Sequence, residues 1–157
     1  MYRISFVILH YQSTNDTVNC VDSIIKNLSS KNYNIVIVDN GSKNGSGQFL
    51  KDNYSNDNKI YVLLSQSNLG FAKGNNLGYH YAREKLNSDF IIVINNDIIL
   101  EQKDFLDKLV EIFEDYHYYI MGPDIVTPEK VHQNPLRENL YSKKSSYVGF
   151  DKKKHYF

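Results

Sequence analysis

The chain has 157 residues, of which 41% are hydrophobic, and its 18 basic side chains balance 18 acidic ones. This length suits one domain with a real hydrophobic core. A formal net charge of zero argues against broad electrostatic capture of nucleic acid, so no nucleic-acid partner is predicted. No apolar run approaches the length of a membrane-spanning helix. The opening residues MYRISFVILHYQ lack the small-residue cleavage site of a signal peptide and are more typical of a first strand.

Short apolar runs alternate along the chain with segments of helical periodicity. Apolar runs of four to eight residues are typical of strands that are buried on both faces of a parallel sheet. The helical segments repeat apolar residues three and four positions apart. In chain order the sequence predicts a strand at 4–9, a helix at 18–28 preceded by the capping residues STNDT, a strand at 34–39, a weaker helix at 46–53, a strand at 59–65, a helix that follows a Gly/Asn loop and ends near 86, a strand at 90–95 and an amphipathic helix at 101–115.

This alternation predicts an α/β fold with a Rossmann-like, mostly parallel sheet covered by helices on both faces. Ligands of such sheets bind just beyond the carboxyl ends of the strands. Polar clusters follow all four predicted strands at that edge. They are His10-Tyr11-Gln12, Asp39-Asn40-Gly41-Ser42, Ser65 to Gly70 and Asn95-Asn96-Asp97.

Cys20 is the single cysteine of the sequence, so neither an internal disulfide nor a zinc site of paired thiols is expected. A reducing compartment is therefore the default. Because Cys20 lies on the apolar stripe of a predicted helix, we expect a core side chain rather than a nucleophile. The spacing of His80, His117, His132 and His155 suggests no metal site, and each is expected to be structural or exposed.

Asp39 has two readings from its position alone. A carboxylate at a strand end can accept hydrogen bonds from the ribose hydroxyls or the base of a nucleotide. The residues DNGS are equally good turn formers, in which case Asp39 caps its own turn.

The segment SNLGFAKGNNLGY is rich in glycine and asparagine. Glycine allows the backbone to approach a ligand closely, whereas Asn68, Asn75 and Asn76 can also serve as simple helix caps and turn residues. The segment is neither a G-x-G-x-x-G fingerprint nor a phosphate-binding loop of the form G-x-x-x-x-G-K-[ST], which disfavours a nicotinamide enzyme and a P-loop kinase.

Asp97 follows the fourth predicted strand and also has two readings. It can belong to a plain turn. It can also bind Mg²⁺ or Mn²⁺, which prefer oxygen ligands and often take one or two carboxylates while phosphates supply the rest.

Taken together, five blocks in order resemble the family 2 glycosyltransferases, which are inverting enzymes with the GT-A fold. The blocks are SFVILHYQS, IVIVDNGSKNGS, SNLGFAKGNNLGYHYA, DFIIVINND and MGPDIV, and they run from about Ile4 to Val126. The rhamnosyltransferase-like branch is the nearest within the family. The resemblance implies a nucleotide-sugar-binding GT-A core at residues 1–126, followed by an incomplete acceptor-side segment or irregular tail at 127–157.

The resemblance also implies a role for individual residues. Asp39 would hold the base or ribose of a UDP-, dTDP- or GDP-linked sugar, and the first loop would help to enclose the base. Asn95 and Asp97 would occupy the two ends of the family's D-x-D motif around Asn96, with Asp97 as the metal ligand. The resulting donor-binding set is His10, Tyr11, Gln12, Asp39, Asn68, Gly70, Lys73, Asn75, Asn76, Asn95 and Asn96, with Asp97 holding Mg²⁺ or Mn²⁺.

The reaction that the resemblance implies is a single displacement. A hydroxyl of a saccharide or lipid-linked acceptor would attack the anomeric carbon, a carboxylate base would remove its proton, and configuration would invert. The family's E-D block for that base is not recognisable. Glu114-Asp115 comes too early, and neither Asp124 nor Asp151 lies in a supporting motif. The sequence therefore predicts donor binding with poor transfer, unless a partner chain or a second copy completes the site.

Two other functions remain open from the sequence. One is a nucleotide-sugar-binding module without transfer activity, and the other is a sugar-phosphate nucleotidyltransferase, although HYQSTNDT lacks the usual phosphate loop of that class. The location is expected to be cytoplasmic, at the inner face of the membrane if the acceptor is lipid-linked. The Lys-rich end, with KKSS and DKKK, is expected to be a solvated tail rather than an anion-binding segment.

Overall fold

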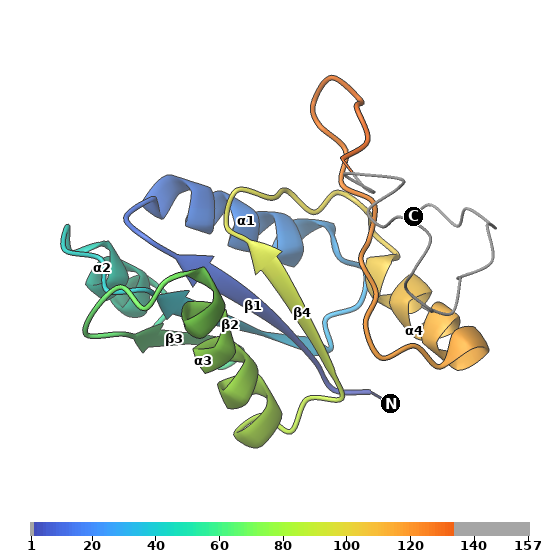
Figure 1. The fold of residues 1–157 in the computed structure, drawn as a ribbon, viewed down its shortest axis with the longest axis horizontal. Coiled ribbons are helices and arrows are strands. Elements are labelled where there is room, and N and C mark those ends of the chain that lie inside the picture. The colour runs from blue at the N-terminus through green and yellow to red at the C-terminus, as the bar shows by residue number, and fades with distance from the viewer. Residues whose placement is uncertain (1, 134–157) are drawn as a thin grey trace, which may run out of the picture. The chain divides into compact units, whose positions relative to one another are not determined.

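The computed structural model describes residues 2–133, and the chain divides into two compact units, residues 1–104 and residues 105–157. The elements, in chain order and as labelled in Figure 1, are β1 (Ile4–His10), α1 (Thr14–Asn27), β2 (Tyr33–Asp39), α2 (Ser46–Asn53), β3 (Ile60–Leu64), α3 (Phe71–Glu84), β4 (Phe90–Asn95) and α4 (Phe105–Tyr116).

The first unit is built on a four-stranded sheet in the order β3-β2-β1-β4, in which every pairing is parallel. The strands end at the same level, because His10 pairs with Asp39 and the preceding Leu9 pairs with Asn95. The α/β class and the parallel sheet are thus confirmed. The polar clusters that follow the strands therefore share one edge of the sheet.

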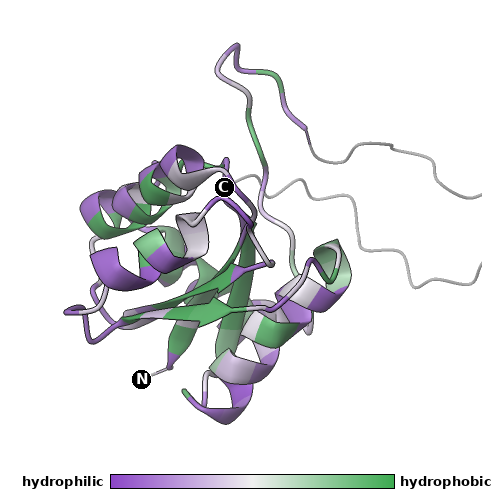
Figure 2. Cartoon of the chain, turned by 90° about the vertical axis from the view of Figure 1, so that its left-hand side faces the viewer, coloured by the Kyte–Doolittle hydropathy of each residue, from purple (hydrophilic) through white to green (hydrophobic). Residues whose placement is uncertain are grey.

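Helices cover both faces of this sheet (Figures 1 and 2). The chain moves outward from β1 to β2 to β3 and then returns to β4 on the other side of β1. Because right-handed crossovers are strongly preferred, this reversal places α1 and α2 on one face and α3 on the other. The strands carry the apolar residues and the helices turn polar residues outward (Figure 2).

Small residues bring α3 close to the sheet. A Cβ at Gly74 would lie 2.5 Å from a methyl carbon of Leu9, and one at Gly78 would lie 2.4 Å from a methyl carbon of Val7. The fully buried Ala82 continues the same stripe one turn later. This close packing fixes the start of α3 beside the carboxyl edge, where the predicted site lies.

Two helices start away from their predicted positions: α1 begins at Thr14 rather than 18, and α4 begins at Phe105 rather than 101. The chain before α4 is held along α1 instead. Leu100 donates its N–H to the Ser23 hydroxyl at 3.0 Å and accepts a hydrogen bond from the Asn27 amide at 2.7 Å. The carbonyl of Lys103 accepts the Ser29 N–H at 3.0 Å. These tertiary hydrogen bonds override the helical propensity of the segment.

The described part of the second unit contains α4 and a short antiparallel turn. Val126 bridges His132, and Lys130 occupies the left-handed region with φ of 63°. The resemblance implied an incomplete acceptor-side segment or an irregular tail from residue 127 onward. The Lys-rich end, Asp151 and His155 lie outside the described residues. Within residues 2–133, no helix has the length and apolar character needed to cross a membrane.

Candidate functional site

Asp39 is the buried carboxylate of the shared edge, with 4% of its surface exposed. The N–H of Ser42 approaches its two oxygens at 3.2 and 3.3 Å, so Asp39 does cap its own turn. A Cβ at Gly47 would lie 2.3 Å from Oδ2, which shows how closely α2 packs on the carboxylate. A carboxylate can accept about four hydrogen bonds, so this single N–H leaves acceptor capacity for a ligand.

The neighbouring Asn40 holds the loop that follows β3. Its side-chain amide donates to Oδ1 of Asn68 at 3.1 Å, and its own Oδ1 accepts the N–H of Leu69 at 2.9 Å. The loops approach so closely that a Cβ at Gly41 would lie 2.3 Å from the carbonyl carbon of Ser67. Gly41 also has φ of 74°, which favours glycine. The loops after β2 and β3 are therefore one hydrogen-bonded body.

The first loop is attached to this body as well. Gln12, with φ of 62°, donates its N–H to the Ser42 hydroxyl at 2.8 Å. Its carbonyl accepts a hydrogen bond from the Asn44 amide at 3.0 Å. Tyr11 is 43% exposed beside it, so its ring is available to a ligand.

His10 lies beneath the loops rather than at their surface. Its side chain is fully buried, with hydrogen bonds of 2.7 Å between Nδ1 and the Thr17 hydroxyl and 2.8 Å between Nε2 and the Ser46 hydroxyl. Nε2 lies 3.9 Å from Oδ1 of Asp39. Burial lowers the pKa of His10 below its ordinary value, while the charge of Asp39 opposes this by raising it. The His10 ring therefore contacts the side chains beneath the site, Thr17 and Ser46, rather than lining the site itself.

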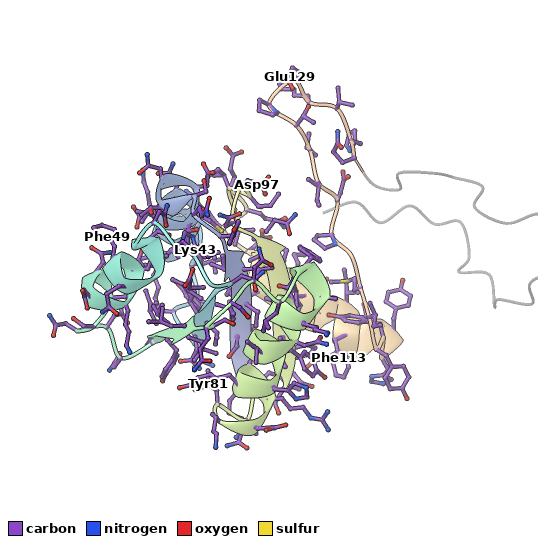
Figure 3. The ribbon with its side chains drawn as sticks, turned by 60° about the vertical axis from the view of Figure 1, so that its left-hand side comes forward. Lys43, Phe49, Tyr81, Asp97, Phe113 and Glu129 are labelled. Atoms are coloured by element: carbon purple, nitrogen blue, oxygen red, sulfur yellow. The ribbon has the colours of Figure 1, made fainter. Side chains whose placement is uncertain are left out.

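The segment Asn95-Asn96-Asp97 forms a turn at the end of β4. Asn95 accepts the N–H of Ile98 at 3.3 Å, which closes the turn around Asn96 and Asp97. The amide of Asn96 reaches back to the Thr17 hydroxyl at 3.1 Å. Asn95 and Asp97 are exposed, and Asp97 lies in Figure 3 toward the same end of the sheet as Lys43. The turn thus presents the Asp97 carboxylate outward.

The residues of this turn fit one side of a divalent cation. Asp97 makes no hydrogen bond or ion pair with any other described residue, so both of its oxygens remain available, and the Asn95 amide oxygen is a second hard donor. No group of three His, Cys, Asp or Glu side chains that could hold a metal occurs within residues 2–133. A cation here would therefore need oxygens from a bound ligand or from water, a sharing that Mg²⁺ commonly accepts.

The predicted residues of α3 and its loop divide by exposure. Asn68, Gly70, Lys73 and Asn76 are exposed, whereas Asn75 is 8% exposed. The Asn75 amide donates to the carbonyl of Phe71 at 3.1 Å, and its Oδ1 is buried without a hydrogen-bond partner among the described residues. These side chains follow the third strand at the shared edge, but no described hydrogen bond joins Lys73 or Asn76 to Asp39 or Asp97.

Cys20 occupies the core under the same edge. It is fully buried and donates from Sγ to the carbonyl of Asn95 at 3.6 Å. Burial, followed by the nearby charge of Asp97, raises the pKa of the thiol to about 12. The expected core role is confirmed, since a thiol with so high a pKa is a poor nucleophile.

Four side chains that organise this edge were absent from the predicted site: Thr17, Asn40, Ser42 and Ser46. Asn40 and Ser42 belong to the quoted DNGS block, and their side-chain turn chemistry was the available signal. Thr17 and Ser46 lie in helices, and nothing in their local sequence indicates that they meet His10.

A comparison with protein families matches residues 5–156 to glycosyl transferase family 2. The chain is 31% identical over 140 residues to the low-salt glycan biosynthesis hexosyltransferase Agl10 of Haloferax volcanii, a match that covers 86% of this chain and 41% of that protein. It is 27% identical over 122 residues to the dTDP-rhamnosyl transferase RfbF of Shigella flexneri, covering 78% of this chain and 39% of that protein.

Solved structures of low sequence identity share the fold. S. aureus TarS 1–349 in complex with UDP-GlcNAc superposes with a TM-score of 0.60 at 19% identity, over 73% of this chain and 32% of that one. The mannosyltransferase PcManGT from Pyrobaculum calidifontis, in complex with GDP-Man and Mn²⁺, gives 0.66 at 14% identity, over 82% of this chain and 36% of that one. The fold is therefore of the GT-A type, as the sequence predicted.

The chain spans less than half the length of each of these four relatives. The match to the family model nevertheless extends over nearly all of its residues and includes all four loops of the shared edge. The chain therefore belongs to glycosyl transferase family 2.

Proposed function

We propose that this chain binds the nucleotide-diphospho-sugar donor of a metal-assisted, inverting glycosyltransferase. The observation that carries the proposal is the pair of carboxylates at the shared edge of the sheet. Asp39, at the end of β2, is buried with unused acceptor capacity. Asp97, in the turn after β4, is exposed, and β1 lies between these two strands. Asp39 is suited to neutral hydroxyl and N–H donors, and Asp97 is suited to a cation.

Each carboxylate then has its own task. Asp39 would accept hydrogen bonds from the ribose or base, with Tyr11 and Gln12 beside it. Asp97, with the amide oxygen of Asn95, would hold Mg²⁺ or Mn²⁺ against the diphosphate. When bound, the cation would offset the negative charge that grows on the leaving diphosphate. Asn68, Gly70, Lys73, Asn75 and Asn76 would border the diphosphate and the sugar.

Three carboxylates come into question for the acceptor side of the reaction: Glu114, Asp115 and Asp124. Glu114 and Asp115 are exposed at the end of α4, and Asp124 is hydrogen-bonded to His132. Because the sequence has no recognisable E-D block for the catalytic base, we propose donor binding with poor transfer by this chain alone. The acceptor would be a saccharide or a lipid-linked glycan, and the cytoplasmic location stays a prediction. The family membership favours this function over a nucleotidyltransferase.

Calorimetry with UDP-glucose, dTDP-rhamnose and GDP-mannose, each with and without Mn²⁺, tests the proposal. We expect one of the three to bind, and to bind more tightly with the metal. If none binds under either condition, the donor-site proposal fails. Efficient inverting transfer by the purified chain to a defined acceptor would instead overturn the statement that transfer is poor, and would require a base among its own residues.

A further inference from the structure

His10 is a fully buried imidazole, and both of its ring nitrogens have hydrogen-bond partners. It is the last residue of the central strand β1. Its own carbonyl accepts the N–H of Asn40 at 2.9 Å, so its backbone is fixed to the loop after β2. A strand end could be filled more simply by an apolar side chain, so the polar contacts of His10 call for an explanation.

The hydrogen-bond partners select one tautomer of the ring. The Thr17 hydroxyl donates to the carbonyl of Ser13 at 3.2 Å, and therefore accepts from Nδ1–H of His10 and from the Asn96 amide. With its proton on Nδ1, the ring accepts from the Ser46 hydroxyl at Nε2. This arrangement satisfies all four of these hydrogen bonds at once. The approach of Nε2 to Oδ1 of Asp39, at 3.9 Å, is too long to be a hydrogen bond. The opposite tautomer takes the Thr17 proton away from Ser13.

This chain of hydrogen bonds connects two loops that are far apart in sequence. On the Nδ1 side it runs through Thr17 to Asn96, whose amide is 79 positions from Thr17. On the Nε2 side it reaches Ser46, 36 positions from His10, at the start of the helix that packs on Asp39. One ring therefore joins the turn that carries Asp97 to the body that carries Asp39.

We propose that His10 is a positioning residue that sets the distance between the nucleoside-binding Asp39 and the metal-binding turn at Asn96-Asp97. The proposal rests on the proposed function of the site and extends it, because it assigns the alignment of the two halves to one buried ring. A donor binds across both halves, so an error in their spacing weakens its metal-dependent affinity even when each half is intact.

The first test removes one hydroxyl without changing the volume of the core. Thr17→Val cuts the link between His10 and Asn96, and Thr17→Ser keeps it. We expect Thr17→Val to reduce the gain in affinity that Mn²⁺ gives to UDP, dTDP or GDP, whichever binds the parent chain, by about tenfold, the usual worth of a buried hydrogen bond. Affinity without the metal should change by less than about twofold, well under the effect of one hydrogen bond.

Two controls separate positioning from general destabilisation. Thr17→Ser should restore the metal-dependent gain. Ser5→Ala removes a buried hydroxyl, bonded to Ser88 at 2.6 Å, from the other end of the same strand, and should lower stability without changing the gain. In a His10→Phe background, Thr17→Val should have no further effect on the gain. Additive effects of His10→Phe and Thr17→Val on the gain would overturn the proposal. Equal losses of nucleotide affinity with and without Mn²⁺ would overturn it as well.

A measurement without ligand distinguishes failure of this inference from failure of the proposed function. Long-range ¹H–¹⁵N spectra report which ring nitrogen of His10 carries the proton, and we expect Nδ1. The side-chain amide of Asn96 should exchange slowly in the parent chain and rapidly in Thr17→Val. If no nucleotide binds, the proposed function is wrong, and positioning of a donor falls with it. If a nucleotide binds but the Asn96 amide exchanges at the same rate in the parent chain and in Thr17→Val, only the His10 proposal is wrong.

Discussion

The two carboxylate-bearing regions of the shared edge are built in opposite ways. The region around Asp39 is buried and tied by hydrogen bonds to the loops that follow β1 and β3. The turn around Asp97 is more exposed, and the described side-chain hydrogen bonds that hold it run from Asn96 to Thr17 and from Cys20 to the carbonyl of Asn95. We therefore expect the first region to be rigid before a ligand arrives, and the second to acquire its final geometry from the proposed cation and diphosphate.

The largest effect is expected where the rigid region is packed most tightly. In Gly41→Ala, the new Cβ would lie 2.3 Å from the backbone of Ser67, and the alanine would have to adopt φ of 74°. Strain and overpacking together should lower the free energy of unfolding by about 3–5 kcal/mol, as measured by urea denaturation.

Gly45→Ala is the matched control for this substitution. Gly45 lies in the same loop with φ of 79°, but a Cβ there meets nothing within 4 Å. It should cost only about 1 kcal/mol, the backbone penalty alone. Equal losses of unfolding free energy in the two variants would mean that the contact between the loops is not tight in solution. The region around Asp39 would then be no more rigid than the turn around Asp97.

Removing the charge of Asp39 should have the next largest effect. Asp39→Asn keeps the shape of the side chain but replaces an ionised acceptor, whose hydrogen bonds are worth about 1.5–3 kcal/mol, so donor affinity should fall about thirtyfold. Calorimetry measures the loss. Asp57→Asn is the control, because Asp57 also caps a turn, through the N–H of Lys59 at 2.8 Å, but before β3 at the opposite edge. A similar loss in both variants would remove Asp39 from the site.

Asp97→Ala should be milder and more selective. The exposed carboxylate supports no hydrogen bond of the described fold, so stability should stay within about 0.5 kcal/mol of the parent chain. Donor affinity should become independent of Mn²⁺, because the cation loses its one charged protein ligand. Glu101→Ala, another exposed acidic residue, should leave the metal dependence intact. If donor affinity in Asp97→Ala still depends on Mn²⁺, the metal is held elsewhere.

The smallest effect is the pH dependence that His10 gives to the buried region. Its folded pKa lies below the unfolded value of 6.5 because burial disfavours the charged ring. As the pH falls, His10 is therefore protonated in the unfolded chain before it is protonated in the folded chain. The contribution of His10 to the free energy of unfolding is complete above pH 6.5 and is lost as the pH falls below that value. Urea denaturation between about pH 5 and 7 measures the slope across the His window. His10→Asn should flatten the slope, whereas the exposed His80→Asn should not.

The sequence predicted the features that depend on local pattern. The apolar runs located all four strands, and the edge at which ligands bind followed from their parallel order. The contacts of Thr17 and Ser46 could not be predicted, because both depend on partners distant in the chain. Thr17 faces the sheet from an amphipathic helix, where a hydroxyl gives no sign of its partner. The start of α4 was missed because hydrogen bonds to Ser23 and Asn27 hold the preceding residues.

The strand order has a consequence for how the edge assembles. Among the described strands, β4 pairs with β1 alone, and their pairing joins the two ends of the first unit. Contacts between distant segments form late in folding, because the loop between them must close first. We therefore expect the Asp97 turn to be completed after the β1-β2-β3 sheet, and to be the first part to open in the folded protein. Native-state hydrogen exchange should show β4 amides exchanging before those of β2.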